Sequence, residues 1–202
     1  MIKNIIFDFG DIFIDLDKPA TGNDFLKLGL KAPVEEIKKI GQAFEVGYLS
    51  TDAFIQSYQE WLPNAHEDQI VAAWNSIIKE FPMKRLEFLQ QLQAEGNYRI
   101  FLLSNTNDLH IEYIKEQVPF YENFKDCFEQ FYLSQEIGLR KPNANIYEFV
   151  LEMNSLKPSE TLFIDDTKAN TDTAAKLGIH IWNLIPGKED ITELFTLKAN
   201  LF

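Results

Sequence analysis

The sequence predicts an α/β protein in which a small helical cap domain is inserted into a doubly wound, Rossmann-like parallel sheet. Three observations favour this fold. Four short apolar runs end in polar clusters, helical patterns alternate with such runs from residue 83 onward, and residues 20–80 show helical patterns without a strand-like run. Short continuous apolar runs are typical of strands buried on both faces, and helix–strand alternation is typical of right-handed crossovers in a parallel sheet.

The predicted strands are rich in Ile, Phe and Leu, and turn or helix-capping residues follow each of them. They span residues 4–9, 98–103, 131–133 and 161–164, and a fifth run covers 179–182 after Gly178. Between them, apolar residues recur at the spacing of an α-helix. The first such stripe is closed by Gly96, a residue that favours a helix C-terminus. The stripes are Leu86, Leu89 and Leu92; Leu109, Tyr113 and Ile114; Ile146, Phe149, Val150 and Met153; and Ala174, Ala175 and Leu177.

Residues 20–80 predict a bundle of helices. Three apolar stripes lie in this segment, and Gly47 and Pro63 separate them. The stripes are Val34, Ile37, Ile40 and Phe44; Phe54, Ile55, Tyr58 and Trp61; and Ile70, Val71, Trp74, Ile77 and Ile78. Because the strand before the bundle must pair with the later strands, we expect a core of residues 1–18 and 81–202 and an inserted cap of residues 19–80. Such an insertion can cover the carboxyl edge of the sheet, where open α/β folds bind ligands.

The composition is that of an ordinary globular protein, with 46% hydrophobic and 25% charged residues among 202. The 19 basic and 31 acidic side chains give a net charge of −12, which disfavours binding to nucleic acid. No apolar run reaches the roughly 18 residues of a membrane span, and the first apolar stretch is too short for a signal peptide. The lone Cys127 fits a reducing compartment, so we expect a cytoplasmic protein. We also expect a monomer or a weak homodimer.

Polar and acidic residues gather where the predicted strands end. Asp8-Phe9-Gly10-Asp11 lies at the end of the first strand, Ser104-Asn105-Thr106-Asn107 follows the second, and Asp165-Asp166 follows the fourth. A further segment, Gly138-Leu139-Arg140-Lys141-Pro142, precedes a helix. Because parallel strands end at one edge, these groups can converge in one crevice. Carboxylates held together repel each other unless a cation joins them, and oxygen ligands near a phosphate favour Mg²⁺.

In order and spacing, these four segments resemble the four motifs of the haloacid dehalogenase-like hydrolase superfamily. The resemblance includes Asn170 beyond the acidic pair and spans the whole chain, and the helical insertion is similar to the small cap of that family. Each motif alone is a weak signal, whereas four in order are a specific one. The first three also resemble the subgroup that contains bacterial α-glucose-1-phosphate phosphatases. The resemblance implies a phosphatase that forms an aspartyl phosphate.

The resemblance implies a role for each polar residue of the first three motifs. Asp8 is the expected nucleophile that attacks phosphorus. Ser104 is expected to bind a phosphoryl oxygen, with Asn105 beside it as a substrate-binding residue, and Lys141 is expected to stabilise the charge of the transferring group. Simpler interpretations are an acidic turn residue for Asp8, a helix N-cap for Ser104 and a surface lysine for Lys141. The presence of all four motifs favours the functional roles.

The expected magnesium ligands are Asp8, the backbone carbonyl of Gly10 and the pair Asp165 and Asp166. Asp166 would bind the ion directly, and Asp165 would be a second ligand or would hold bound water. A surface turn can also carry two acids, but it rarely lies at the tip of so apolar a strand.

One position departs from the family. Most phosphatases of this superfamily have a second Asp two residues after the nucleophile, which protonates the leaving group, and here that position is Gly10. Three alternatives remain: Asp11 swings in beside the substrate as the acid, the leaving group needs no acid, as in an anomeric sugar phosphate, or a water or substrate hydroxyl supplies the proton. Loss of a positioned acid typically costs about a hundredfold to ten-thousandfold in rate, so we expect low activity on generic substrates. The resembled subgroup also has Gly here, which favours a phosphatase over an inactive protein.

The loop at 45–51 is the part of the cap most suited to substrate selection, because in related proteins such a loop faces the active site. Glu45 and Tyr48 are its candidate substrate-binding residues, with sugar hydroxyls as the expected partners. A solvated loop is the simpler interpretation.

The favoured function is therefore a Mg²⁺-dependent phosphatase that acts on a small phosphorylated metabolite, with a sugar phosphate as one candidate. A metal-independent 2-haloacid dehalogenase also uses an Asp nucleophile. It would leave Asp165 and Asp166 without a cation, and such enzymes place an aromatic residue where Gly10 stands. The third alternative is a non-catalytic ligand-binding or regulatory protein on the same scaffold, and the retained motif side chains argue against it.

Overall fold

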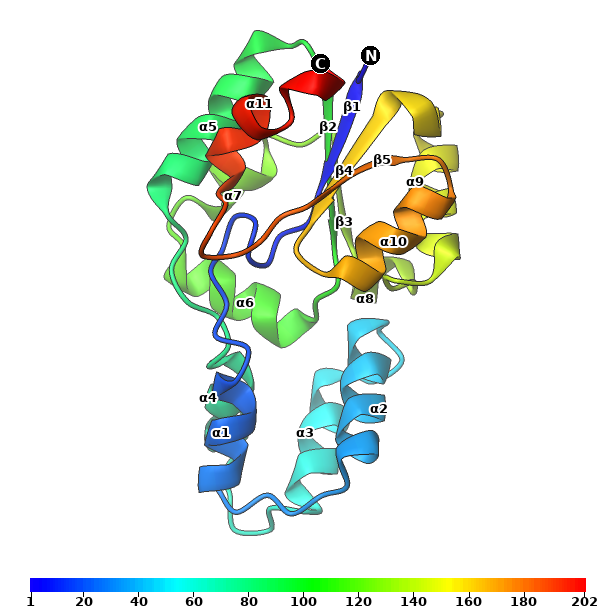
Figure 1. Ribbon diagram of the computed structural model, residues 1–202. Helices are drawn as coiled ribbons and strands as arrows, with labels where there is room; N and C mark the ends of the chain where they lie inside the picture. Colours follow the sequence, from blue (N-terminus) through cyan, green and yellow to red (C-terminus); the bar gives the residue numbers. More distant parts are fainter.

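A five-stranded parallel sheet forms the centre of the larger domain in the computed structural model, which describes residues 1–202 (Figure 1). The strand order is β3-β2-β1-β4-β5, and every neighbouring pair is parallel. The strands are β1 (Asn4–Phe7), β2 (Arg99–Ser104), β3 (Gln130–Leu133), β4 (Thr161–Asp165) and β5 (His180–Asn183). All five predicted strands are therefore present, with ends that differ by one or two residues.

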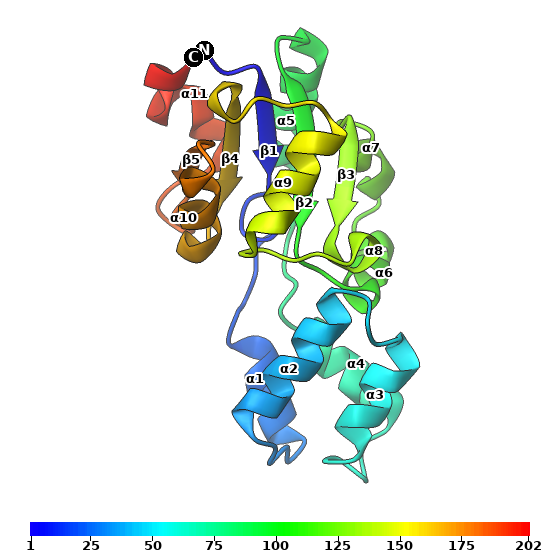
Figure 2. The same cartoon turned by 90° about the vertical axis from the view of Figure 1, so that its right-hand side faces the viewer.

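Helices cover both faces of the sheet, because successive residues of its central strands point to opposite sides. Ile5 and Phe7 of β1 belong to one apolar cluster and Ile6 belongs to another. One face carries α5 (Met83–Glu95), α6 (Asp108–Gln117), α7 (Tyr121–Lys125) and α11 (Leu194–Leu197), and the other carries α9 (Ala144–Met153) and α10 (Lys168–Lys176) (Figure 2). A short helix, α8 (Ser134–Ile137), and 3-10 turns at Pro158–Glu160, Ile191–Glu193 and Ala199–Leu201 complete the core. The predicted doubly wound fold is confirmed.

The strand order determines which edge of the sheet is functional. From β1 the chain adds β2 and β3 on one side, and then returns to add β4 and β5 on the other side of β1. A crevice forms at such a reversal, outside the carboxyl ends of the strands. Asp8 directly follows β1 and Asp165 is the last residue of β4, so both acids lie at this crevice.

Four helices form the inserted cap: α1 (Ala20–Lys27), α2 (Val34–Glu45), α3 (Thr51–Gln59) and α4 (Glu67–Asn75). The sequence predicts only three, because α1 buries a single apolar side chain, Phe25, and shows no stripe. The sequence also predicts Ile77 and Ile78 in the last helix, but α4 ends at Asn75, and Ile78 instead forms a β-bridge with Leu16. None of the helices of the protein is long and apolar enough to cross a lipid bilayer.

Closely packed aromatic rings form the interior of the cap. The ring centroids of Phe44 and Phe54 are 4.3 Å apart, and the ring of Trp74 lies 4.6 Å from that of Phe54. Leu109 of α6 belongs to the same apolar cluster. The apolar interior of the cap therefore continues into the larger domain at α6.

Two backbone segments connect the cap to the core, and they pair with each other. Asp15 donates its N–H to the carbonyl of Glu80 at 2.8 Å and accepts a hydrogen bond from the N–H of Lys79 at 2.9 Å. Asp17 donates its N–H to the carbonyl of Ile77 at 2.8 Å. The predicted domain boundaries after residues 18 and 80 lie at these paired connections and stay a prediction.

A closed hydrogen-bond network joins α4 to α6. Oδ1 of Asn107 accepts from the backbone N–H of His110 at 3.1 Å and from the indole N–H of Trp74 at 3.2 Å. This orients the Asn107 amide so that its Nδ2 lies 3.1 Å from Nδ1 of His110, while Nε2 of His110 lies 3.3 Å from the carbonyl of Trp74. A neutral imidazole protonated on Nε2 satisfies both contacts. A second proton, on Nδ1, would face an amide donor.

We predict that acid weakens this docking. Burial lowers the pKa of His110 to about 4, below the ordinary value of about 6.5 that applies to the unfolded chain. The unfolded chain therefore binds the extra proton first, and the contribution of His110 is lost as the pH falls below about 6.5. From about pH 7.5 to about pH 5 the loss is about 2 kcal/mol. Urea unfolding should show a shallower pH slope for His110→Gln than for wild type. Equal slopes for His110→Gln and wild type would contradict the prediction.

Candidate active site

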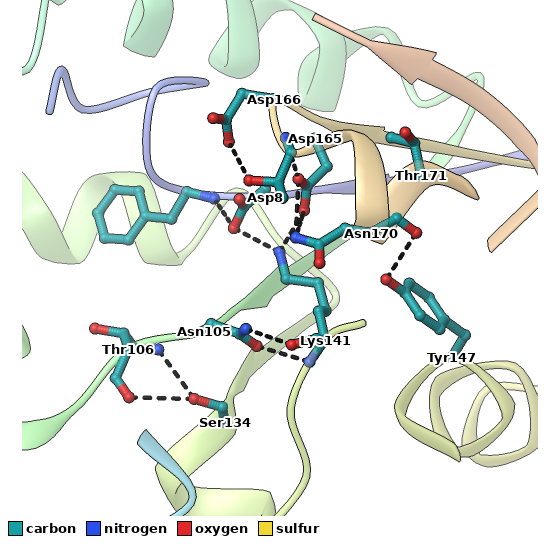
Figure 3. A network of polar contacts seen from close by, with 12 residues as sticks. Asp8, Asn105, Thr106, Ser134, Lys141, Tyr147, Asp165, Asp166, Asn170 and Thr171 are labelled. Atoms are coloured by element: carbon teal, nitrogen blue, oxygen red, sulfur yellow. Dashed lines mark hydrogen bonds and ion pairs between the residues drawn. The ribbon is translucent and has the colours of Figure 1, made fainter. Parts of the chain in front are cut away.

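A buried ion pair network forms the centre of the crevice (Figure 3). Nζ of Lys141 lies 2.8 Å from Oδ1 of Asp8 and 2.7 Å from Oδ2 of Asp165. The Lys141 side chain is 1% exposed and that of Asp165 is fully buried. Lys141 lies in the segment before α9. Its side chain therefore links the ends of β1 and β4 to that segment.

Asn105 positions the backbone of Lys141. Its Nδ2 donates to the carbonyl of Lys141 at 2.9 Å, and its Oδ1 accepts from the N–H of Lys141 at 2.9 Å (Figure 3). Asn105 also lines a cavity that Asp8, Lys141 and Asp166 border, which we call the catalytic cavity. The sequence suggests a substrate-binding role for Asn105, and both atoms of its amide are engaged by Lys141 instead.

Asp165 is surrounded by donors. Oδ1 accepts from the N–H of Thr167 at 2.8 Å, and both of its oxygens lie 3.0 Å from Nδ2 of Asn170. The carbonyl of Asn170 accepts in turn from the hydroxyl of Tyr147 at 2.9 Å. The start of α10 therefore fixes the Asp165 carboxylate, whereas Asp166, the next residue, lies on the wall of the cavity.

Lys18 adds a second cation, which sequence reasoning missed. Its Nζ lies 2.9 Å from Oδ2 of Asp11 and forms a short ion pair with Asp166. Lys18 belongs to the first connection to the cap and follows no strand, so no motif marks it. Only the folded chain brings it to the carboxyl edge.

Asp11 does not line the cavity. Its Oδ1 accepts from the N–H of Leu16 at 3.0 Å and its Oδ2 pairs with Lys18, so its carboxylate has partners on both oxygens. The backbone at Asp11 is left-handed, with φ of 56°. Asp tolerates this conformation better than most residues, because its short polar side chain can form local hydrogen bonds.

The remaining predicted residues, Ser104, Glu45 and Tyr48, lie in different surroundings. Ser104 ends β2 and is a buried residue, and its hydroxyl is not among the buried side-chain atoms that lack a partner. Glu45 pairs with Arg140, which lines the catalytic cavity. Tyr48 is 79% exposed and lines a neighbouring cavity instead. The structure thus groups Asp8, Gly10, Asn105, Lys141 and Asp166 around one cavity of about 290 Å³. The other predicted site residues do not line it: Asp11, Glu45, Tyr48, Ser104 and Asp165.

Sequence reasoning also missed Ser134, which shapes the loop after β2. Its hydroxyl accepts from the N–H of Thr106 at 2.9 Å and donates to the carbonyl of Thr106 at 3.1 Å (Figure 3). Ser134 begins α8 and is fully buried. A serine at the end of a strand looks like an ordinary helix start, so the sequence gives no sign of this contact.

The acidic cluster has more carboxylates than ammonium groups, and burial disfavours the charged form of its acids. Burial raises the pKa of Asp8, which Lys141 lowers and Asp165 raises further. Burial also raises the pKa of Asp166, against the effect of Lys18. The pKa of Lys141 stays above its ordinary value, because its contacts with Asp165 and Asp8 outweigh its burial. Two ammonium groups face the carboxylates of Asp8, Asp11, Asp165 and Asp166.

The donor set fits a magnesium ion. One carboxylate oxygen from each of Asp8, Asp165 and Asp166 lies within 4.8 Å of the others. Oxygen ligands in an octahedral arrangement are those that Mg²⁺ prefers. Gly10 lines the same cavity, and a Cβ at this position would lie 2.6 Å from Cδ1 of Leu16. The side chain that most phosphatases of the superfamily have here would therefore require Leu16 to move.

The fold and the site together define a hydrolase of a known class. Residues 2–178 match the haloacid dehalogenase-like hydrolase family, and the chain belongs to that family. It is similar to D-ribitol-5-phosphate phosphatase from Bacteroides thetaiotaomicron, with 32% identity over 190 residues that cover 88% of this chain and 89% of that protein.

Solved structures agree with this assignment. A family enzyme from Bacteroides thetaiotaomicron in complex with magnesium and inorganic phosphate has a TM-score of 0.85 at 34% identity, covering 96% of this chain and 100% of that one. A HAD-like hydrolase from Porphyromonas gingivalis has a TM-score of 0.85 at 29% identity, covering 98% of both chains. An L-2-haloacid dehalogenase shares the fold, with a TM-score of 0.63 at 14% identity, covering 98% of this chain and 99% of that one.

These comparisons confirm the predicted family, and they make the chain a homologue of a phosphatase and of a magnesium-bound enzyme. The narrower resemblance to α-glucose-1-phosphate phosphatases is not tested by these relatives and stays a prediction.

Replacement of Lys141 by Met should strongly destabilise the metal-free protein. Asp8 and Asp165 would stay buried without their counter-charge, and loss of one partner of a buried ion pair costs about 3–5 kcal/mol. Urea denaturation in EDTA should show a fall of about this size in the free energy of unfolding.

The double variant Lys141→Met/Asp165→Asn should recover part of that loss, because it removes one of the two buried charges. Lys31→Met, at an exposed lysine, is the control and should change stability by less than about 0.5 kcal/mol. Equal stabilities of Lys141→Met and the control would show that Lys141 does not balance the buried carboxylates.

Proposed function

We propose that this protein is a Mg²⁺-dependent phosphatase that hydrolyses a small phosphorylated metabolite through an aspartyl phosphate on Asp8. One observation carries the proposal: the Lys141 ammonium touches both Asp8 and Asp165, and Asp166 lies on the wall of the same cavity. This arrangement brings a nucleophile, a cation for the phosphoryl group and a cation-deficient oxygen cluster into one site. The homology to a phosphatase supports it.

Asp8 is held for nucleophilic attack. Its Oδ1 accepts from the N–H of Phe9 at 2.7 Å and pairs with Lys141, while Oδ2 has no protein partner. In the proposed reaction an Asp8 oxygen forms a bond to phosphorus, the bond from phosphorus to the ester oxygen breaks, and the alcohol leaves with a proton. Water then cleaves the aspartyl phosphate, which releases inorganic phosphate and restores Asp8.

The lysines and the cation divide the electrostatic work. Lys141 stabilises the charge on the transferring phosphoryl group. Lys18 pairs with Asp11 and Asp166 and so reduces the repulsion between their carboxylates. Mg²⁺, held by Asp8, Asp166, Asp165 and the carbonyl of Gly10, would supply the positive charge that the buried carboxylates and the phosphate require.

In this proposal no carboxylate of the protein donates a proton to the leaving group. Asp11 lies off the cavity, and both of its oxygens have partners. This supports the two alternatives that need no displaced enzyme acid: a leaving group that departs without one, or a water or substrate hydroxyl as the donor.

A sugar or polyol phosphate is the substrate class that we favour. The phosphatase from Bacteroides thetaiotaomicron, of which the alignment covers 89%, is named for D-ribitol 5-phosphate. We also propose a cytoplasmic location, where the free and buried Cys127 stays reduced, and a monomeric or weakly dimeric state.

The proposal is tested by phosphate release from a panel of phosphorylated sugars, polyols and nucleotides. We expect turnover that EDTA abolishes and Mg²⁺ restores. Asp8→Asn removes the nucleophile and should lower kcat by about ten-thousandfold or more. Asp172→Asn, at an exposed acid of α10, is the control and should match wild type.

Two results would count against the proposal. Halide release from a chlorinated acid without metal would favour the dehalogenase alternative. Binding of phosphate esters without any turnover would favour the non-catalytic alternative.

A further inference from the structure

The end of α2 lies against the core beside the active site. In both ribbon views, the loop after α2 passes close to α8 (Figures 1 and 2). A Cβ on Gly47 would lie 2.4 Å from the carbonyl oxygen of Gln135, and Gly47 has a φ of +70°, so glycine is required here. This close approach holds Glu45, the last residue of α2, next to the segment that carries Arg140.

Glu45 and Arg140 form an ion pair between the cap and the core. Nε and Nη2 of Arg140 donate to the same oxygen, Oε2 of Glu45, at 3.0 Å and 2.8 Å. Both side chains are about three-quarters buried, with 27% of Glu45 and 24% of Arg140 exposed. Oε1 of Glu45 and Nη1 of Arg140 have no protein partner.

Arg140 lines two neighbouring cavities. One is the catalytic cavity with Asp8, and the other has a volume of about 420 Å³. Arg140 is the only charged residue of the second cavity, whose other polar side chains are Gln42, Tyr48, Asn143 and Asn145. Because Arg140 borders both spaces, the second cavity is suited to the part of a substrate that extends beyond its phosphate.

The Glu45–Arg140 ion pair determines which ligand groups the second cavity can bind. A guanidinium without a partner binds a carboxylate or phosphate through two parallel hydrogen bonds. Glu45 already occupies that edge of Arg140, and its negative charge repels a second anion. Glu45 itself lines neither cavity, so it acts on the second cavity through the charge of Arg140. The uncharged polar side chains that line this cavity, such as Gln42, Asn143 and Asn145, suit hydroxyl groups.

We propose that Glu45 is a specificity-determining residue: by neutralising Arg140, it restricts the substrate to phosphomonoesters whose leaving group carries hydroxyls and no second anion. This inference rests on the proposed phosphatase function and narrows its substrate class. The phosphate is recognised at Lys141, and the uncharged, hydroxylated remainder is recognised at the cap–core boundary.

Two esters of equal length test the inference: a pentitol 5-phosphate, and the pentonate 5-phosphate in which a terminal carboxylate replaces the hydroxymethyl group. The quantity to measure is the ratio of kcat/KM for the pentonate ester to that for the pentitol ester. Wild type should favour the pentitol ester. Glu45→Gln keeps the shape of the side chain and removes its charge, so the ratio should rise by about tenfold to a hundredfold.

The double variant Glu45→Gln/Arg140→Gln should lose this gain, because the unpaired guanidinium is gone. Glu129→Gln is the matched control, since Glu129 pairs with Arg99 on the surface through two of the Arg99 nitrogens, and its ratio should equal that of wild type. An unchanged ratio in Glu45→Gln would overturn the inference, as would a gain that survives in the double variant.

Binding separates this inference from the proposed function. Both esters are titrated calorimetrically into Asp8→Asn, with and without Glu45→Gln, so that neither is consumed. A shift of relative affinity toward the pentonate ester supports the role of Glu45 even if wild type shows no turnover, in which case the proposed phosphatase function fails alone. Equal relative affinities, or no binding of either ester, overturn the inference.

Discussion

The buried Lys141 ammonium between Asp8 and Asp165 is the interaction on which the rest of the active site depends. A charge removed from water is tolerated only with partners at hydrogen-bond distance, so the elements that supply those partners must meet. The ends of β1 and β4 meet at this side chain, and the loop after β2 holds the Lys141 backbone through Asn105. Neutral groups fix the geometry of the charged ones through hydrogen bonds from Asn105, Thr167 and Asn170.

This constraint also reconciles the net charge of −12 with an anionic substrate. The overall charge is a sum over the whole surface, whereas a ligand responds to the local field. Locally, Lys18 and Lys141 pair with acids whose burial already penalises their charged forms. A divalent cation would therefore balance the charge of this carboxylate cluster as well as serve catalysis. The anion is attracted once the lysines and the cation outweigh the carboxylates.

The sequence predicts the parts of this protein that follow from local rules. Strands buried on both faces reveal themselves as apolar runs, and Asp8, Asp165 and Asp166 stand out because acids at the tips of such runs need an explanation. What local rules do not contain is side-chain pairing across the fold. The contacts of Lys18 with Asp166 and of Glu45 with Arg140 join residues far apart in the chain. The direction of the Asp11 side chain depends on a left-handed backbone. Helix α1 is not predicted from the sequence, because only Phe25 of that helix is buried.

The paired connections between cap and core make the inserted domain modular. The N–H of Asp17 and the carbonyl of Ile77 are 2.8 Å apart, so the insertion leaves and re-enters the core at nearly the same point. For the core, the whole cap replaces a tight turn. Because its two ends lie side by side, a short turn could connect them if the cap were absent. The entropic cost of closing such a loop rises only slowly with its length. Caps of different size can therefore be exchanged at these two positions during evolution, while the catalytic edge of the sheet stays the same.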